Sequence, residues 1–414
     1  MLYALFDYLQ DQYNFPGAGV FQYISFRAAM AFILSLVITI VVGKRFINYQ
    51  TKNKNYEEIR DIDKADQEKK QEIPTMGGLF IIAGIVIPVL LFSSLNNVYI
   101  QLLLVTVIWL GFIGFVDDYQ KMKYRNKDGL AGKYKVIGQV VLALIVGSTL
   151  YWHPDVKIKE QITDNQLIES GLHQKKDTKS SVEYQEIRTT KTTIPFIKNN
   201  ELDYSNSFLS LGKKWGWLIF IPVVVFVVVA MSNGANLTDG MDGLATGTSA
   251  IIGITLGVLA YLSGNAIFSD YLNILYIPDS GEMLIFMTAF VGATLGFLWY
   301  NAYPAQVYMG DTGSLMLGGV IAVFAISIRK ELLLPCLAGI FLVENLSVLI
   351  QTYYFKYTRI KTGKGKRIFL RAPIHHHFQM KQNNIKKYDS KIVTRFFLVG
   401  LLLAVLTIVT LKLR

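Results

Sequence analysis

Two groups of acidic and amide side chains are the first residues in this sequence whose spacing could support chemistry. Asp117 and Asp118 are adjacent at the end of an apolar run, and such carboxylates repel each other unless a cation bridges or neighbours them. Asn236, Asp239 and Asp242 recur every three residues among several glycines, so on a helical turn they would share one face. A solvated helix end explains the first group equally well. An ordinary turn needs fewer such residues than the second group has.

Two further motifs add a lone carboxylate and a run of histidines. Asp311 precedes a predicted helix that begins with small residues. The N-terminal amides of that helix could hold an anion such as phosphate, although Asp311 would also be an ordinary helix cap. His375, His376 and His377 are consecutive in a basic stretch. Adjacent side chains project in different directions, so hydrogen bonding to a polyphosphate is at least as natural as binding one metal ion.

The composition places these motifs in a membrane protein. Of the 414 residues, 52% are hydrophobic and only 17% are charged, against about a quarter charged in soluble domains. The single cysteine, Cys336, excludes a disulfide framework and a cysteine-based metal cluster. The net charge of +11 does not indicate nucleic-acid binding, because the basic residues lie in short loops between apolar runs. Residues 1–20 contain no Lys or Arg, so no cleavable signal peptide is expected.

The apolar runs predict an all-α integral membrane protein. Ten of them are long enough to cross a hydrocarbon core of ~30 Å, and ten spans place both termini on the same side. The runs lie near residues 22–43, 76–96, 98–116, 134–152, 215–232, 243–264, 283–302, 313–328, 332–356 and 393–412.

The distribution of Lys and Arg predicts the orientation. Loops 44–72, 117–135 and 356–395 hold eight, six and twelve basic residues, whereas 265–282 holds none. Short basic loops remain in the cytoplasm, so both termini are predicted to be periplasmic. All four motifs fall in loops assigned to the cytoplasmic side, a coincidence that is hard to attribute to structural accident.

The chain is predicted to have three parts: a tail and four spans in 1–152, an insertion in 153–214, and six spans in 215–414. Residues 153–212 of this insertion carry eight basic and nine acidic residues, and long loops cross the membrane largely regardless of charge. We therefore expect a small periplasmic subdomain. The alternation of Val182, Tyr184, Glu186 and Arg188 predicts a β-hairpin strand within it.

The chemistry suggested by these motifs is phosphoryl transfer. Carboxylates gathered with many cations suit Mg²⁺, which binds through a few carboxylates plus substrate phosphates. Mg²⁺ and Lys neutralise the charge that develops on a transferring phosphoryl group. A membrane setting suggests a lipid partner and a soluble phosphate ester. Because a phosphate monoester is largely ionised near pH 7, we expect direct attack rather than a covalent aspartyl relay.

At these residues the chain resembles the phospho-N-acetylmuramoyl-pentapeptide transferases, within the polyprenyl-phosphate N-acetylhexosamine-1-phosphate transferase superfamily. The resemblance runs from about Lys44 to the C-terminus, apart from the insertion, which is longer than family members usually have. The histidine motif is the best discriminator, since relatives that use UDP-GlcNAc carry a differently spaced cluster. The matching motifs are Pro74–Gly78, Asp117–Asp118, the stretch 236–245, Met309–Ser314 and Pro373–Phe378.

The resemblance implies transfer of phospho-MurNAc-pentapeptide from UDP-MurNAc-pentapeptide to undecaprenyl phosphate in the bacterial inner membrane, giving lipid I and UMP. It implies that Asp311 binds the Mg²⁺ cofactor and that Asp117, with Asp118 beside it, activates the lipid phosphate. Lys135 is close enough to Lys133 to fit the same family position. A homodimer is permitted but not established. The substrate contacts implied are Lys70, Thr75, Lys121, Lys133, Asn236, Asp239, Asp242, Asn301, His375, His376 and His377.

Two other functions are weighed against this one. A sister enzyme that moves GlcNAc-1-phosphate or another hexosamine phosphate would carry much the same motifs. A transporter would carry ionisable residues inside its spans and a site near the membrane midplane. Here the carboxylates lie at span ends, and only Glu344 lies well inside a span. Glu344 either lines a cavity near the site or is hydrogen-bonded between helices, and the sequence supports both equally.

Overall fold

The computed structural model describes residues 1–53, 73–124, 129–161, 184–187, 189–194, 201–205, 215–272, 274–381 and 389–411. Helices make up most of these residues, which confirms the predicted fold class. Lys70 lies outside the described residues, as do Val182 and Arg188 of the expected strand.

Each of the ten predicted apolar runs contains a described helix. Eight of the described helices are long and apolar enough to cross a membrane, or nine if one bent pair counts as a single span. Helix α4 has only 15 residues, or about 22 Å at 1.5 Å per residue. Ten spans therefore remain a prediction. The helices are α2 (Ile24–Lys52), α4 (Gly78–Phe92), α5 (Val98–Tyr124), α6 (Gly132–Trp152), α8 (Trp217–Thr238), α9 (Leu244–Ser263), α11 (Ser280–Asn301), α12 (Gly310–Ser327), α13 (Leu334–Leu337) with α14 (Gly339–Thr362), and α16 (Asp389–Thr410).

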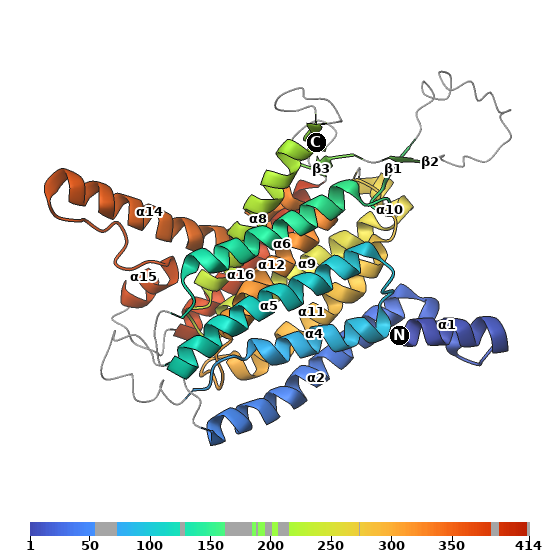
Figure 1. Ribbon diagram of the computed structural model, residues 1–414, viewed down its shortest axis with the longest axis horizontal. Coiled ribbons are helices and arrows are strands. Elements are labelled where there is room, and N and C mark those ends of the chain that lie inside the picture. Colours follow the sequence, from blue (N-terminus) through green and yellow to red (C-terminus); the bar gives the residue numbers. More distant parts are fainter. Residues whose placement is uncertain are drawn as a thin grey trace.

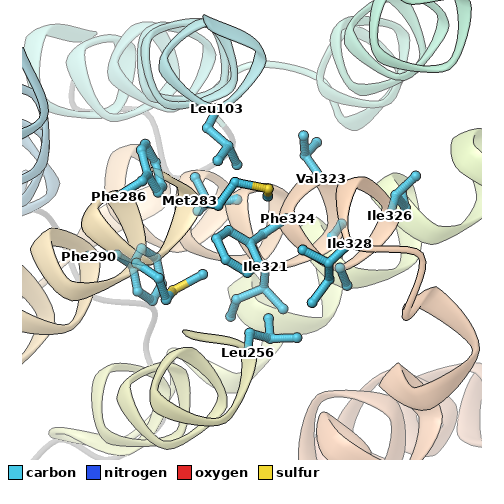
Figure 2. Close-up of a cluster of buried hydrophobic side chains, with 14 of the residues drawn as sticks. Leu103, Leu256, Met283, Phe286, Phe290, Ile321, Val323, Phe324, Ile326 and Ile328 are labelled. Atoms are coloured by element: carbon cyan, nitrogen blue, oxygen red, sulfur yellow. The ribbon is translucent and has the colours of Figure 1, made fainter. Parts of the chain in front are cut away.

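Helix α12 is the centre of the bundle. Every residue from Thr312 to Ser327 is buried, and the helix packs against α5, α8, α4 and α9. Its Phe324 lies beside large side chains of α11 such as Phe286 and Phe290 (Figure 2). Lipid tails are as apolar as these side chains, so close van der Waals packing rather than water exclusion holds such helices together. The packing of four helices against α12 therefore holds both ends of this helix in place.

The ninth predicted run is not one straight helix. Helices α13 and α14 meet at 79°, where Ala338 leaves helical geometry. Helix α14 extends away from the bundle (Figure 1) and exposes apolar side chains such as Leu346 and Ile350. The predicted run over 332–356 is therefore divided between two helices, because hydropathy does not register a change of direction.

Short elements complete the fold. Helix α1 (Leu2–Tyr13) and the 3-10 helix η1 (Ala18–Gln22) occupy the segment expected to be an N-terminal tail. The terminal amine of Met1 donates to the carbonyl of Leu90 at 2.7 Å, which ties this segment to α4. Two further short helices, α10 (Ala266–Leu272) and α15 (Ile374–Lys381), lie in segments expected to be loops.

Two small antiparallel sheets lie within the predicted insertion. Strand β1 (Ile158–Gln161) pairs with β2 (Tyr184–Ile187), which lies where the sequence alternation predicts a strand. Strand β3 (Lys191–Thr193) pairs with β4 (Glu201–Asp203). The 3-10 helix η4 (Glu331–Leu333) connects α12 to α13 beside β3. Strands β1 and β2 lie at the end of the bundle opposite α15 (Figure 1).

Candidate active site

Three carboxylates meet where α5 ends and α12 begins. Asp117 and Asp118 come from α5, and Asp311 comes from the first turn of α12. One oxygen from each lies within 4.8 Å of the others. Gly114 allows this approach, because a side chain there would collide with the backbone of Asp311. These three carboxylates, here called the acidic cluster, are arranged as a site that could hold a metal ion.

Asp118 fixes the position of α12. Its carboxylate accepts hydrogen bonds from the backbone amides of Asp311 at 3.0 Å and Thr312 at 2.9 Å, and from the Thr312 hydroxyl at 2.6 Å. These amides are the helix N-terminal donors that the sequence suggested for a phosphate. That expectation was wrong, because a carboxylate of the protein already occupies them.

Two lysines neutralise the other two carboxylates. Lys121, one turn after Asp117 on α5, lies 2.7 Å from Asp117 and 3.5 Å from Asp311. Lys135, in the first turn of α6, lies 2.8 Å from Asp117 and 2.5 Å from Asp311. Lys133 is exposed and its ammonium lies over the ring of Tyr134. Of the two candidates for the family's basic position, the geometry brings Lys135 to the acidic cluster.

The amide-and-acid motif lines a cavity beside the acidic cluster. Asn236 lies near the end of α8 and donates to Asp311 at 3.0 Å and to Ser314 at 2.9 Å. Asp239 ends the helix, and Asp242 lies in the turn that follows. The three residues share one cavity rather than one helical face. Its volume is about 290 Å³, and its lining also includes Thr75, Asp118, Lys121, Asn301, Tyr308 and Asp311.

The segment before α4 supplies another wall of this cavity. Tyr308 donates its amide to the carbonyl of Pro74, and its own carbonyl accepts from Gly77, both at 2.9 Å. This pairing joins two sequence motifs more than 200 residues apart. It places Thr75, whose buried hydroxyl has no hydrogen-bond partner among the described residues, in the cavity wall.

Asn301 lines the same cavity, but its amide group is engaged in holding the structure together. Its oxygen accepts from the Gly243 amide at 3.1 Å and the Thr246 hydroxyl at 3.0 Å. Its nitrogen donates to the carbonyl of Val307 at 3.0 Å. These bonds tie the turn after α8 to the segment before α12. The structure thus gives Asn301 a positioning role.

The three consecutive histidines of α15 contact three different partners. His375 is fully buried, with Nδ1 3.1 Å from Glu344 on α14, and its Nε2 lies against Gly240 of the cavity wall, where a side chain would collide with it. His376 contacts Gln379 at 3.1 Å. His377 accepts from the Leu370 amide at 3.1 Å. The geometry therefore does not gather them on one metal ion.

The comparisons with known proteins agree with this arrangement. The sequence pattern of glycosyl transferase family 4 matches residues 181–329. The phospho-N-acetylmuramoyl-pentapeptide-transferases of Flavobacterium psychrophilum and Amoebophilus asiaticus are each 56% identical to this chain, with both chains covered in full. The protein of the same name from Porphyromonas gingivalis is 51% identical, again over the full length of both. The chain belongs to the phospho-N-acetylmuramoyl-pentapeptide-transferase family.

The structure brings to the site several residues that the sequence alone did not assign clearly. Lys135 was left as an alternative to Lys133, although its place in the first turn of α6 beside a motif loop was a usable signal. The pairing of Glu344 with His375 had no sequence signal, because the two residues are 31 positions apart on different helices. Ser314 and Thr312 were seen only as small residues, yet both hydroxyls contact the site.

Proposed function

We propose that this chain transfers phospho-MurNAc-pentapeptide from UDP-MurNAc-pentapeptide to undecaprenyl phosphate, forming lipid I and releasing UMP. The observation that carries the proposal is the cavity of carboxylates, amides and lysines at one end of an apolar helix bundle. A soluble nucleotide sugar and the phosphate of a membrane lipid can meet at such a boundary. The names of the relatives with full-length identity support the same reaction.

The residues of the acidic cluster fit Mg²⁺. All three donors are carboxylates, the hard oxygen ligands that this ion prefers. Asp311 would hold the ion, because it lines the cavity while Asp117 does not, and because Asp118 is engaged with the amides of α12. When bound, Mg²⁺ would neutralise charge on the phosphates.

The geometry supports a direct transfer. A covalent relay needs a carboxylate that is free to attack phosphorus. Asp118 is held by three hydrogen bonds at the start of α12. Asp117 is fully buried, contacts Lys121 and Lys135, and accepts from the Leu130 amide at 2.7 Å. We infer that Asp117 orients the two ammonium groups, which shield the ionised lipid phosphate as it attacks the β-phosphate and UMP leaves.

The same proposal includes an orientation. The basic loops and this cavity would face the cytoplasm of a bacterium, with the chain in the inner membrane, ten spans, and both termini and the 153–214 insertion outside. The parts 1–152 and 215–414 would together form the catalytic bundle.

The test is the release of UMP by purified protein. We expect release from UDP-MurNAc-pentapeptide only when undecaprenyl phosphate and Mg²⁺ are both present, and little release from UDP-GlcNAc. Faster turnover of UDP-GlcNAc would assign the chain to the sister activity. Absence of lipid-dependent UMP release from either donor would overturn the proposal.

A further inference from the structure

A buried arginine lies at the end of α12 that is remote from the acidic cluster. Arg329 is 4% exposed, and its Nη1 has no hydrogen-bond partner among the described residues. Its guanidinium lies over the ring of Phe220 at 4.9 Å. The nearby carboxylate of Glu331 balances part of this buried charge, but a buried donor that makes no hydrogen bond is costly. The 18 residues of α12 place Arg329 about 27 Å from the acidic cluster, at 1.5 Å per residue.

The backbone holds Arg329 firmly in this position. Its φ of 56° lies in the left-handed region, which non-glycine residues seldom adopt. Its carbonyl accepts from the Thr193 amide at 3.0 Å and from the Thr192 hydroxyl at 3.2 Å. Strand β3 thus fixes the strained residue. Strain that the surroundings maintain in this way is found at ligand sites.

Arg329 lines a cavity of about 240 Å³, here called the distal cavity. On its lining also lies Asp203 of β4, which accepts from the hydroxyls of Thr190 and Ser205, both at 2.6 Å. Burial raises the pKa of Asp203, but the hydrogen bonds from Ser205 and Thr190 and the nearby Lys191 outweigh it and hold that pKa below its usual value. The distal cavity therefore presents one cation and one anion.

Aromatic side chains place the distal cavity at the membrane boundary. Tyr151 and Trp152 line it at the end of α6, and Trp152 is 52% exposed. The Trp152 ring lies 6.2 Å from that of Trp217 at the start of α8. Trp and Tyr at the ends of spans mark the level of lipid headgroups. The ligand of this cavity should therefore be found in that layer.

We propose that the distal cavity binds the headgroup of a zwitterionic phospholipid, with the phosphate at Arg329 and a primary ammonium at Asp203. A phosphate alone would leave Asp203 facing an anion, and an amine alone would leave the Arg329 Nη1 without a hydrogen-bond partner. A phosphate beside an ammonium matches both charges, and Arg donates to phosphate in a planar fork. The volume exceeds the roughly 10–15 Å³ that one water needs.

The test uses the full-length protein, stripped of lipid in detergent and then supplied with defined lipids. Binding is measured by native mass spectrometry and by the rise in melting temperature. We expect one phosphatidylethanolamine to bind at least tenfold more tightly than phosphatidylglycerol or phosphatidylcholine. Phosphatidylglycerol lacks the ammonium, and the quaternary ammonium of phosphatidylcholine cannot donate a hydrogen bond to Asp203.

Two variants and a matched control separate the parts of the site. Arg329→Met should weaken phosphatidylethanolamine binding at least tenfold, and Asp203→Asn should remove the preference over phosphatidylglycerol. Lys133→Met removes an exposed cation at the start of α6, the end of that helix opposite Trp152, and should leave the preference intact. If Arg329→Met does not fold, the lipid preference of Asp203→Asn decides the matter.

Three results would overturn the proposal. The first is equal binding of the three lipids by the unaltered protein. The second is an unchanged preference in Asp203→Asn. The third is equal stabilisation by inorganic phosphate or free phosphoethanolamine, which would show that the site takes a soluble anion or zwitterion rather than a lipid.

Discussion

The two ends of α12 both carry charged residues, yet the structure uses them in opposite ways. At the N-terminal end, Asp311 meets Lys121 and Lys135 on the wall of an open cavity. At the C-terminal end, Lys330 is completely buried under β3 and donates to the Thr193 hydroxyl at 2.6 Å. Charges that face a cavity can act on a ligand, whereas charges sealed beneath a strand can only anchor the chain.

The electrostatic environments of the two ends differ accordingly. Burial lowers the pKa of Lys330 to about 7, against the attraction of Glu331 and Glu201. The buried cation is thus close to losing its charge. The lysines at the other end each lie within 3 Å of the Asp117 carboxylate. The same helix therefore separates a reactive end from an anchoring end, and mutations at the two ends should have different consequences.

The largest expected effect is on the reactive end. Asp311→Asn keeps the size of the side chain but removes the charge proposed to hold Mg²⁺. Turnover should fall by on the order of 10²-fold or more, the scale of losing a key electrostatic stabiliser, while the melting temperature stays close to that of the unaltered protein. Asp270→Asn, at a carboxylate on α10, is the matched control and should retain full activity. Near-normal turnover in Asp311→Asn would show that Asp311 only caps α12 and does not hold Mg²⁺.

A smaller loss of activity is expected from Glu344→Gln, which weakens the contact that positions His375 against the cavity wall. A hydrogen bond to a charged group contributes about 1.5–3 kcal/mol, so kcat/KM should fall roughly tenfold, mainly through a higher KM for the nucleotide sugar. Glu282→Gln breaks a comparable pair with Arg27 and should lower stability without changing KM. Equal effects of the two variants on KM would assign Glu344 a purely structural role.

On the anchoring end, Tyr204→Phe removes the hydroxyl that donates to Glu331 at 3.0 Å. Loss of this buried bond should cost about 1–2 kcal/mol of stability, seen as a lower melting temperature. The kcat of the folded protein should be unchanged. A drop in kcat with no change in melting temperature would show that this end of α12 contributes to catalysis rather than to stability.

Much of this arrangement could be predicted from the sequence, because it depends on local patterns. Hydropathy located a helix in each apolar run. The grouping of motifs in alternate loops correctly predicted that Asp117, Asn236 and Asp311 lie together. Such inferences need only the length of a span and the side on which it ends.

The remainder depends on long-range geometry that no local pattern encodes. The 79° bend between α13 and α14 and the contact of Glu344 with His375 depend on how distant helices pack. The sequence suggested that the N-terminal amides of α12 could bind a phosphate. In the structure they instead donate hydrogen bonds to Asp118 on α5. The unpartnered Nη1 of Arg329 is likewise visible only once β3 and α12 are placed together.

The side of the membrane on which each end of α12 lies can be tested without altering the residues at either end. On a Cys336→Ser background, a cysteine at Lys364 beyond α14 should be labelled by an impermeant reagent only after the membrane is permeabilised. A cysteine at Asp155, which is exposed near β1, should be labelled in intact spheroplasts. Activity should be unchanged in both. Labelling of the Lys364 site from outside would place the reactive end away from a cytosolic nucleotide.

The most direct test of the central claim is the timing of UMP release. Enzyme at high concentration is mixed with radiolabelled UDP-MurNAc-pentapeptide and Mg²⁺ in detergent free of lipid phosphate, and undecaprenyl phosphate is added later. Direct transfer at the acidic cluster predicts that no UMP appears before the lipid phosphate is added and that Asp311→Asn then releases it on the order of 10²-fold more slowly. A stoichiometric burst of UMP before that addition, with label retained on the denatured protein, would contradict this account.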